Sequence, residues 1–311
     1  MHTKAEMKVW QGRVDDEGPR ALRWHQCVKA LEEGGARGMA LLGFACDAGV
    51  RRNHGRPGAA GGPLVIRQIL AGQPWHAACP VYDAGDVICQ GDALEATQEA
   101  LSVAVEKLLG EQHFPIVLGG GHEVAWGSFQ GLARHLARQP GHVQLGIINF
   151  DAHLDMRLSQ EPSSGTPFAQ IARECAARGW PFNYLCVGMA ETANTNGLID
   201  SAKASGAQII RDEEVQPWVL ASALDRVQAF VNACDLIYLS IDIDVMPANQ
   251  APGVSAPAAY GVPLASLEGL IDCIRNSGKL RLVDLAEFNP DFDQQNLTAR
   301  SIARLIYRLV R

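Results

Sequence analysis

Two aspartates and a histidine stand at alternate positions directly after the apolar run 145–150. They are Asp151, His153 and Asp155, and their side chains point the same way if the extended backbone continues, because side-chain direction in a strand repeats every two residues. Carboxylates this close together repel each other unless a positive charge lies between them. The pattern therefore indicates a divalent metal ion, although a polar turn with a solvated histidine would have the same spacing.

Two further groups of possible ligands follow other predicted strands. His122 comes after the run 114–118 and three glycines, and Asp242 and Asp244 follow the run 236–241. In open parallel α/β sheets, ligands gather beyond the carboxyl ends of the strands, so the three groups are expected to meet there. Six ligands exceed the needs of one four-coordinate zinc ion but suit two ions that share bridging carboxylates.

The ligand types narrow the choice of metal. Four carboxylates with two imidazoles favour Mn²⁺ over Zn²⁺ or Mg²⁺, and four aspartates balance the charge of two divalent ions. A nucleotide-phosphate loop at Gly119–Gly121 is a poor alternative, because the full G-x-G-x-x-G spacing is missing and no Gly-Lys-Ser/Thr follows.

Apolar strands that alternate with helices must position these ligands. The alternation predicts an α/β protein with a mostly parallel sheet of about eight strands, covered by helices on both faces. Strands are expected at 39–44, 81–87, 114–118, 143–150, 182–187, 208–210, 236–241 and 280–288. Helices are expected at 62–71, 93–109, 124–137, 167–177, 194–204, 217–232, 264–275 and 296–309.

No repeat, low-complexity tract or linker divides the chain. We therefore expect a single catalytic domain over residues 1–311. The polar, glycine-interrupted residues 1–37 are expected to form an N-terminal extension with a short helix around 22–31.

Composition argues against several classes of function. The net charge is −7 and no block of Lys and Arg makes a basic face, which argues against nucleic acid or an anionic membrane as partner. No apolar stretch has the length of a membrane span, and the N-terminus lacks a signal-peptide core. The eight cysteines are scattered without a C-x-x-C pair, so we expect reduced thiols in a cytoplasmic protein.

Three motifs together resemble the signatures of the arginase/agmatinase (ureohydrolase) family. They are Gly-Gly-Gly-His-Glu at 119–123, Asp-Ala-His-Leu-Asp at 151–155 and Ser-Ile-Asp-Ile-Asp-Val at 240–245. The resemblance implies a three-layer α/β/α arginase-like fold with a binuclear manganese centre. One ion would be held by His122, Asp151, Asp155 and Asp242, and the other by Asp151, His153, Asp242 and Asp244.

A late motif at 284–290 resembles the last signature of the family. Its glutamate, Glu287, would contact the cationic amidine or guanidine end of the substrate. Asp155 would orient the attacking hydroxide and relay a proton to the leaving amine.

Other segments resemble the formimidoylglutamase branch of this family. They are the loop 49–56 and the segments 163–168, 193–195 and 251–257. Phe168 stands where arginases have a histidine thought to shuttle protons. The resemblance implies hydrolysis of N-formimidoyl-L-glutamate to L-glutamate and formamide in histidine degradation, by a metal-bridging hydroxide that attacks the formimidoyl carbon.

The two carboxylates of such a substrate need cationic partners, and arginine binds a carboxylate through two parallel hydrogen bonds. Arg157, just past the central motif, is the first candidate, and two arginines of the loop 49–56 come second. With hydroxyl and amide donors, the expected substrate contacts are Arg157, Arg56, Arg52, Ser164, Thr166 and Asn194. His54, His135 and His142 are expected in loops or at the surface, without a partner.

Two other functions remain open from the sequence. The chain could be a ureohydrolase for a guanidino acid or an agmatine-like substrate, because the arginines would serve that carboxylate equally well. It could also be a catalytically silent member with a binding or regulatory role, although all six ligand positions are retained. The family often forms trimers or hexamers, so we expect a homo-oligomer with a small-molecule substrate.

Overall fold

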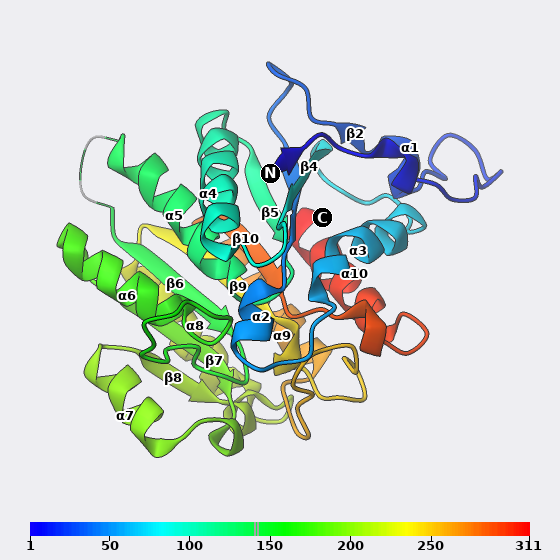
Figure 1. The fold of residues 1–311 in the computed structure, drawn as a ribbon. Coiled ribbons are helices and arrows are strands. Elements are labelled where there is room, and N and C mark those ends of the chain that lie inside the picture. The colour runs from blue at the N-terminus through cyan, green and yellow to red at the C-terminus, as the bar shows by residue number, and fades with distance from the viewer. Residues whose placement is uncertain (140, 142) are drawn as a thin grey trace.

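A sheet of ten strands, counted over the described residues, runs through the centre of the molecule (Figure 1). The computed structural model describes residues 1–139, 141 and 143–311, so the expectation for His142 lies outside the described residues. The strands are β1 (His2–Thr3), β2 (Lys29–Ala30), β3 (Met39–Ala45), β4 (Val81–Ile88), β5 (Phe114–Leu118), β6 (Leu145–Phe150), β7 (Asn183–Met189), β8 (Gln208–Arg211), β9 (Leu236–Asp242) and β10 (Leu280–Ala286).

The prediction of a mostly parallel sheet is confirmed. The strand order is β1-β4-β3-β5-β10-β9-β6-β7-β8, with β2 beside β4, and all pairs among the eight longer strands are parallel. These eight strands match the expected ones to within two residues at each end. The additional strands are the two-residue β1 and β2 of the N-terminal segment, and β1 pairs antiparallel with β4.

Helices cover both faces of the sheet and enclose an apolar core on each side (Figure 1). Successive strand residues point to opposite faces, so that Leu41 belongs to one core and Leu42 to the other. The core of Leu42 is covered by α4 (Leu94–Gly110), α5 (Val124–Ala137), α6 (Pro167–Arg178) and α7 (Asn196–Ala204). The core of Leu41 is covered by α3 (Gly62–Ala71), α8 (Leu220–Ala233), α9 (Leu264–Asn276) and α10 (Leu297–Val310).

Four neighbouring strands at the centre of the sheet carry the predicted chemistry. They lie in the order β5, β10, β9, β6, and Leu118 pairs with Leu285, Ala286 with Asp242, and Ile241 with Phe150. Because these strands are parallel and in this register, their carboxyl ends reach one edge of the sheet together. The segments that follow β5, β6, β9 and β10 are therefore side by side, although more than a hundred residues separate the first from the last.

Residues 1–37 are built into the sheet and one core. Both β1 and β2 pair with β4, and Trp10 donates a hydrogen bond of 2.8 Å from Nε1 to the buried Asp83. Trp24 is fully buried and packs edge-to-face on Trp75, with ring centroids 5.4 Å apart. The expected helix at 22–31 is reduced to α1 (Trp24–Cys27), because the chain becomes extended at Val28 before it enters β2.

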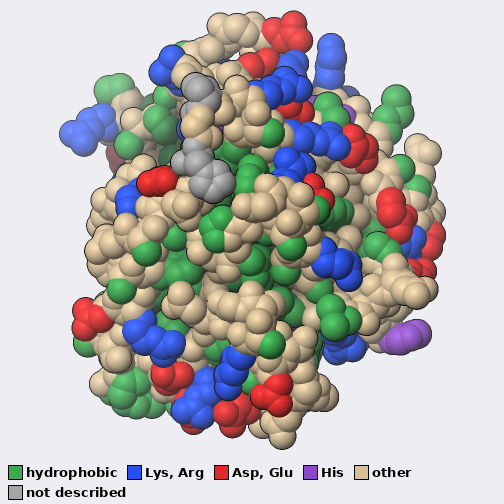
Figure 2. Space-filling model, turned by 90° about the vertical axis from the view of Figure 1, so that its left-hand side faces the viewer, with side chains coloured by type: hydrophobic (Ala, Val, Ile, Leu, Met, Phe, Trp, Pro, Cys, Tyr) green, Lys and Arg blue, Asp and Glu red, His purple; other side chains and the backbone are tan. Residues whose placement is uncertain are grey.

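The short helix α2 (Ala48–Arg52) lies in the loop after β3, where the sequence analysis expected a glycine-rich loop alone. Among the described residues, no helix is long and apolar enough to cross a membrane. On the face that Figure 2 shows, lysine and arginine side chains are interspersed with aspartate and glutamate and do not form one basic patch.

Replacement of Trp24 by alanine is expected to destabilise the fold by about 3–5 kcal/mol, because a fully buried indole leaves a large cavity. Thermal and urea unfolding of the purified variant would measure the loss. Trp218→Ala is the matched control, since that indole is 74% exposed and its removal should change stability by less than about 0.5 kcal/mol. Equal stability of the two variants would mean that the N-terminal segment contributes little to the core.

Candidate metal centre

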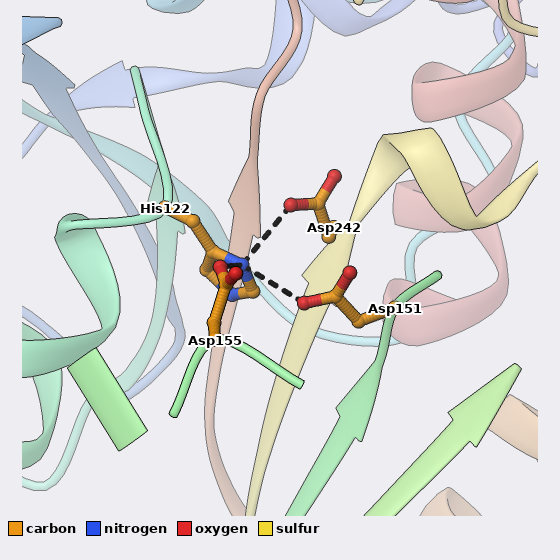
Figure 3. Close-up of side chains that lie close together, drawn as sticks. All are labelled: His122, Asp151, Asp155 and Asp242. Carbon is orange, nitrogen blue, oxygen red and sulfur yellow. Dashed lines mark ion pairs between the residues drawn. The ribbon is translucent and has the colours of Figure 1, made fainter. Parts of the chain in front are cut away.

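The first group of predicted ligands surrounds one nitrogen of His122. Its Nδ1 lies 3.2 Å from Asp151 Oδ2, 2.9 Å from Asp155 Oδ2 and 3.0 Å from Asp242 Oδ2. Figure 3 shows the three carboxylates around the imidazole, with Asp151 and Asp155 from the segment after β6 and Asp242 from the end of β9. Donors about 2.1 Å from a common ion and at right angles to one another are about 3 Å apart, so this spacing suits a coordination sphere.

The second group shares Asp151 with the first. His153 Nδ1 lies 3.1 Å from Asp244 Oδ2 and 3.6 Å from Asp151 Oδ1, so the two oxygens of Asp151 face the two groups. The other predicted bridge, Asp242, turns its Oδ1 to the backbone N–H of Asp244 at 2.8 Å. The second group of close donors is therefore Asp151, His153 and Asp244, without Asp242.

An unpartnered buried nitrogen tests whether these residues fit a metal ion. Among the described residues, His122 Nδ1 has no hydrogen-bond partner despite its three oxygen neighbours, because none of them lies where an N–H would point. Buried Asp244 Oδ1 likewise has none. Buried polar atoms are rarely left without a partner, and a metal ion bound in each group of donors would satisfy them. The donor set, hard oxygens with imidazole nitrogens, fits Mn²⁺.

The electrostatics point the same way. Burial works against a charge on His122, but the nearby carboxylates of Asp151, Asp155 and Asp242 outweigh it and raise the pKa of the imidazole well above its ordinary value. Burial and the charges of Asp244 and Asp151 raise the pKa of Asp242 well above that of a free carboxyl group. The cluster thus attracts positive charge strongly, and two divalent ions supply it in place of protons.

Hydrogen bonds from buried groups hold the ligand-bearing segments in unusual backbone conformations. Asp155 has φ +46° and Glu287 has φ +66°, a left-handed conformation that residues other than glycine adopt rarely. The loop after β6 is braced by Asn194, whose Oδ1 accepts from Leu154 N–H at 3.0 Å and whose Nδ2 donates to Ala152 O at 2.9 Å. Local sequence alone does not stabilise these conformations, so distant residues must.

A series of hydrogen-bonded side chains supports His122 at its Nε2, away from the carboxylates at Nδ1. Its Nε2 lies 2.9 Å from Ser240 Oγ, which donates to Asp284 Oδ1 at 2.6 Å, and Asp284 also accepts from the Tyr238 hydroxyl at 2.5 Å. For Nδ1 to offer its lone pair to a metal, Nε2 must carry the proton and donate it to Ser240. Phe168 packs edge-to-face on the same imidazole, with centroids 5.3 Å apart.

Glu287 lies beside the metal ligands. Its Oε1 accepts from the backbone N–H of His122 at 2.9 Å, and its own N–H donates to Gly120 O at 2.7 Å. Burial, with the nearby charge of Glu123, raises the pKa of this carboxyl group to about 8. No cation of the described residues pairs with Glu287, and a buried carboxylate of this kind is suited to receive a cationic group.

The ligands open into a cavity of about 300 Å³. Arg157, Arg56, Ser164 and Glu287 line it, and so do Asp155, His153, Asp242 and Asp244. A larger and more open hollow of about 650 Å³ lies beside α2, but none of the metal-centre residues lines it. The smaller cavity is the candidate substrate site because it brings ligands and arginines together.

The predicted substrate contacts do not all face this cavity. Arg157 does, and its guanidinium makes no hydrogen bond or ion pair to the described residues. Arg56 does as well, but it donates to Ser255 O at 3.0 Å and Val254 O at 2.6 Å and stacks on Phe292. Ser164 accepts from Asn53 Nδ2 at 3.2 Å.

Three other predicted substrate contacts already form hydrogen bonds or ion pairs with protein groups. Arg52 is outside the cavity and binds Glu95, Asp92 and the carbonyl of Pro162. Thr166 caps the turn before α6 and donates to Ser163 O at 3.0 Å. Asn194 lines the cavity, but its amide is committed to the backbone bracing described above.

Sequence reasoning missed Asn53, His54 and Ser255 as cavity residues. His54 was expected as a loop residue without a role, yet it lies in the cavity wall with φ +60°. Its neighbour Asn53 stands in the loop 49–56, which also holds Arg56. Because Arg56 was predicted at the substrate, the sequence could have indicated its neighbours in this loop as cavity residues. The positive φ of His54 was not visible in the sequence.

Replacement of Ser240 by alanine is expected to weaken divalent-metal binding about 10–100-fold, because the proton on His122 Nε2 loses its acceptor. Titration of metal-free protein with Mn²⁺ would measure the change. Ser266→Ala is the control, since Ser266 is a buried serine of α9 whose hydroxyl has no partner among the described residues. Unchanged affinity in Ser240→Ala would remove Ser240 from the support of the metal centre.

Comparisons with known proteins agree with this site. The family model described as "Arginase family" matches residues 37–311. The chain is 55% identical over 310 residues to a formimidoylglutamase of Aeromonas hydrophila, with 98% of each chain covered. It is 52% identical over 314 residues to a formimidoylglutamase of Ralstonia nicotianae, with 100% of this chain and 97% of the relative covered.

Solved structures share the fold. The crystal structure of Trypanosoma cruzi formiminoglutamase with Mn²⁺ superposes with a TM-score of 0.78 at 25% identity, over 88% of this chain and 92% of that one. Arginase from Bacillus subtilis superposes with a TM-score of 0.75 at 26% identity, over 88% and 98%. The motifs, the three-layer fold and the family match agree, and the chain belongs to the arginase family.

Proposed function

We propose that this chain hydrolyses N-formimidoyl-L-glutamate to L-glutamate and formamide, with two Mn²⁺ ions per chain, as a step of histidine degradation. The observation that carries the proposal is the 55% identity to a formimidoylglutamase over nearly the whole of both chains. A second observation supports it: the two groups of metal donors open into the same cavity as Arg157 and Glu287.

The metal would be held by the residues that carry the motif. His122, Asp151, Asp155 and Asp242 would hold one ion, and Asp151, His153 and Asp244 the other. When bound by these residues, two divalent ions would lower the pKa of water and so would supply a strong nucleophile at neutral pH.

The side chains of the cavity have distinct tasks in this reaction. Glu287 binds the amidinium end of the substrate, because its buried carboxylate has no cation of its own. Asp155 orients the attacking water and passes its proton towards the leaving nitrogen. As the water oxygen bonds to the formimidoyl carbon, the bond from that carbon to the glutamate nitrogen breaks, and formamide and glutamate are released.

Arg157 is the proposed anchor for a substrate carboxylate. It follows the ligand-bearing segment 151–155 and lines the cavity. No side chain or backbone group of the described residues binds its guanidinium and would compete with a ligand. Arg56 is a second anchor whose orientation is set by the backbone of the segment 254–255. Arg52 is a weaker candidate, since its guanidinium already binds two carboxylates and a carbonyl.

Purified, Mn²⁺-loaded protein should release formamide from N-formimidoyl-L-glutamate and no urea from agmatine or guanidino acids. Formamide and urea can be measured in parallel on the same preparation. Urea from a guanidino substrate would replace this proposal with the ureohydrolase alternative. Absence of both products from a preparation with full metal content would favour the catalytically silent alternative.

Replacement of Asp242 by alanine should abolish activity and metal binding together, because its carboxylate supplies one of the three oxygens around His122 Nδ1. Metal analysis of the purified variant beside an activity assay tests both at once. A variant that keeps two Mn²⁺ per chain would show that Asp242 is not a required ligand.

Replacement of Arg157 by alanine should raise KM for the formimidoyl substrate about 10–100-fold with a smaller effect on kcat, since a charged hydrogen-bond partner of the substrate is lost. Steady-state kinetics measure the split. Arg178→Ala is the control, because Arg178 pairs with Glu174 on the surface of α6. If kcat/KM of Arg157→Ala equals that of the unmodified protein, Arg157 does not anchor the substrate.

We further infer that residues 1–311 form one catalytic domain, which the pairing of β1 and β2 with β4 supports. We infer a cytoplasmic location, which the eight free cysteines support. A homo-oligomer is favoured by membership of the arginase family. Light scattering at micromolar concentration tests the last inference, and a monomer would contradict it.

A further inference from the structure

Glu123 is a buried carboxylate that the metal centre and the proposed reaction do not use. It follows the metal ligand His122 directly and stands at the start of α5. Its side chain is fully buried, and burial raises the pKa of its carboxyl group to about 7. Burial of an ionisable group is costly, so its contacts need an explanation.

The contacts of this carboxylate lead to the loop after β3. Its Oε1 accepts from the backbone N–H of Gly49 at 2.8 Å and lies 3.6 Å from the thiol of Cys46. Its Oε2 has no hydrogen-bond partner among the described residues. Gln98, from α4, donates to the backbone carbonyl of Glu123 at 2.8 Å and fixes the residue from the other side.

The space around the carboxylate is kept free by two glycines. A Cβ on Gly49 would lie 2.6 Å from Glu123 Oε2, and one on Gly121 would lie 2.1 Å from the same atom. Both distances are shorter than real contacts allow. The chain therefore has glycine at the two positions where a side chain would collide with the carboxylate of Glu123.

Gly49 connects Glu123 to the substrate cavity. The carbonyl of Gly49 accepts from the backbone N–H of Asn53 at 2.9 Å, across the single turn of α2. The side chain of Asn53 donates to Ser164 at 3.2 Å, and both residues line the cavity. A series of hydrogen bonds thus connects Glu123, through Gly49 and Asn53, to Ser164 in the lining of the cavity.

We propose that Glu123 is a positioning residue. It holds α2, and with it Asn53 and the following residues, against the segment that carries the metal ligand His122. In this way it sets the shape of the part of the cavity that receives the substrate's carboxylates. This role requires a side chain long enough to accept a hydrogen bond from Gly49 N–H, and it does not require a negative charge. The kinetic part of this inference rests on the proposed formimidoyl-glutamate hydrolysis.

Two variants separate reach from charge. Glu123→Gln keeps the length and an acceptor oxygen but removes the charge, whereas Glu123→Asp keeps the charge but is one methylene too short for Gly49. Glu123→Asp should raise KM for N-formimidoyl-L-glutamate about tenfold with kcat changed less than about threefold, and Glu123→Gln should stay within about threefold of the unmodified protein in both constants. Both should bind two Mn²⁺ per chain.

Amide hydrogen exchange tests the same inference without reference to activity. In the Mn²⁺-loaded protein, the segment 47–56 should exchange faster in Glu123→Asp and at an unchanged rate in Glu123→Gln. Trp10→Phe is the matched control, since it removes one buried hydrogen bond, to Asp83, far from the cavity. It should change neither exchange in 47–56 nor KM.

Two outcomes would overturn the proposal. One is that exchange in 47–56 is the same in Glu123→Asp as in the unmodified protein. The other is that Glu123→Gln raises KM while Glu123→Asp does not, which would assign the role to charge. If the unmodified protein releases no formamide, the proposed function fails, but exchange in 47–56 still decides the role of Glu123.

Discussion

The burial of like charges at one edge of the sheet is the constraint on which the rest of the structure depends. Asp151, Asp242 and Asp244 are buried within a few ångströms of one another, with two imidazoles between them. Such a cluster is costly unless cations occupy it. The surrounding structure must therefore bring the carboxylates together at positions where metal ions can coordinate them.

The parallel sheet does this by its strand order. Four central strands, β5, β10, β9 and β6, end at the same edge, and each contributes a short segment to the site. Two apolar cores fix the strands from both sides, so the segments beyond their ends are held by a rigid base. The left-handed backbone at Asp155 and Glu287 is tolerated because surrounding hydrogen bonds over-determine it.

The helices and strands could largely be predicted from the sequence, and the predicted metal ligands lie close together, whereas the positions of the side chains in the substrate loops could not be predicted. His122, Asp151 and Asp242 stand at or just after the ends of apolar strands, and short apolar runs bounded by glycine or charged residues can be recognised in the sequence. Arg52 and Asn194 were expected at the substrate, but the first binds Glu95 and the second braces the loop after β6. In a loop the direction of a side chain depends on distant partners, which short-range patterns do not encode.

The same limit explains the N-terminal segment. Its polar, glycine-broken sequence resembles an extension, yet Trp10 and Trp24 are buried against residues brought in by β4 and α3. Their burial depends on tertiary contacts and not on any local period. The helix α2 was missed for a related reason: only five residues long, it is stabilised by contacts outside itself, among them the bond from Gly49 to Glu123.

The position of β10 between β5 and β9 has a consequence for protein synthesis. The ligand-bearing ends of β5 and β9 do not pair with each other directly, and β10, residues 280–286 of 311, fills the place between them. The donor group that includes His122 therefore cannot assemble until β10 has been synthesised and has joined β5 to β9. A chain that ends before β10 could still pair β6 with β9 and bring Asp151, His153 and Asp244 together, but it would lack the strand that places His122 beside them, so the complete set of ligands forms only late in synthesis.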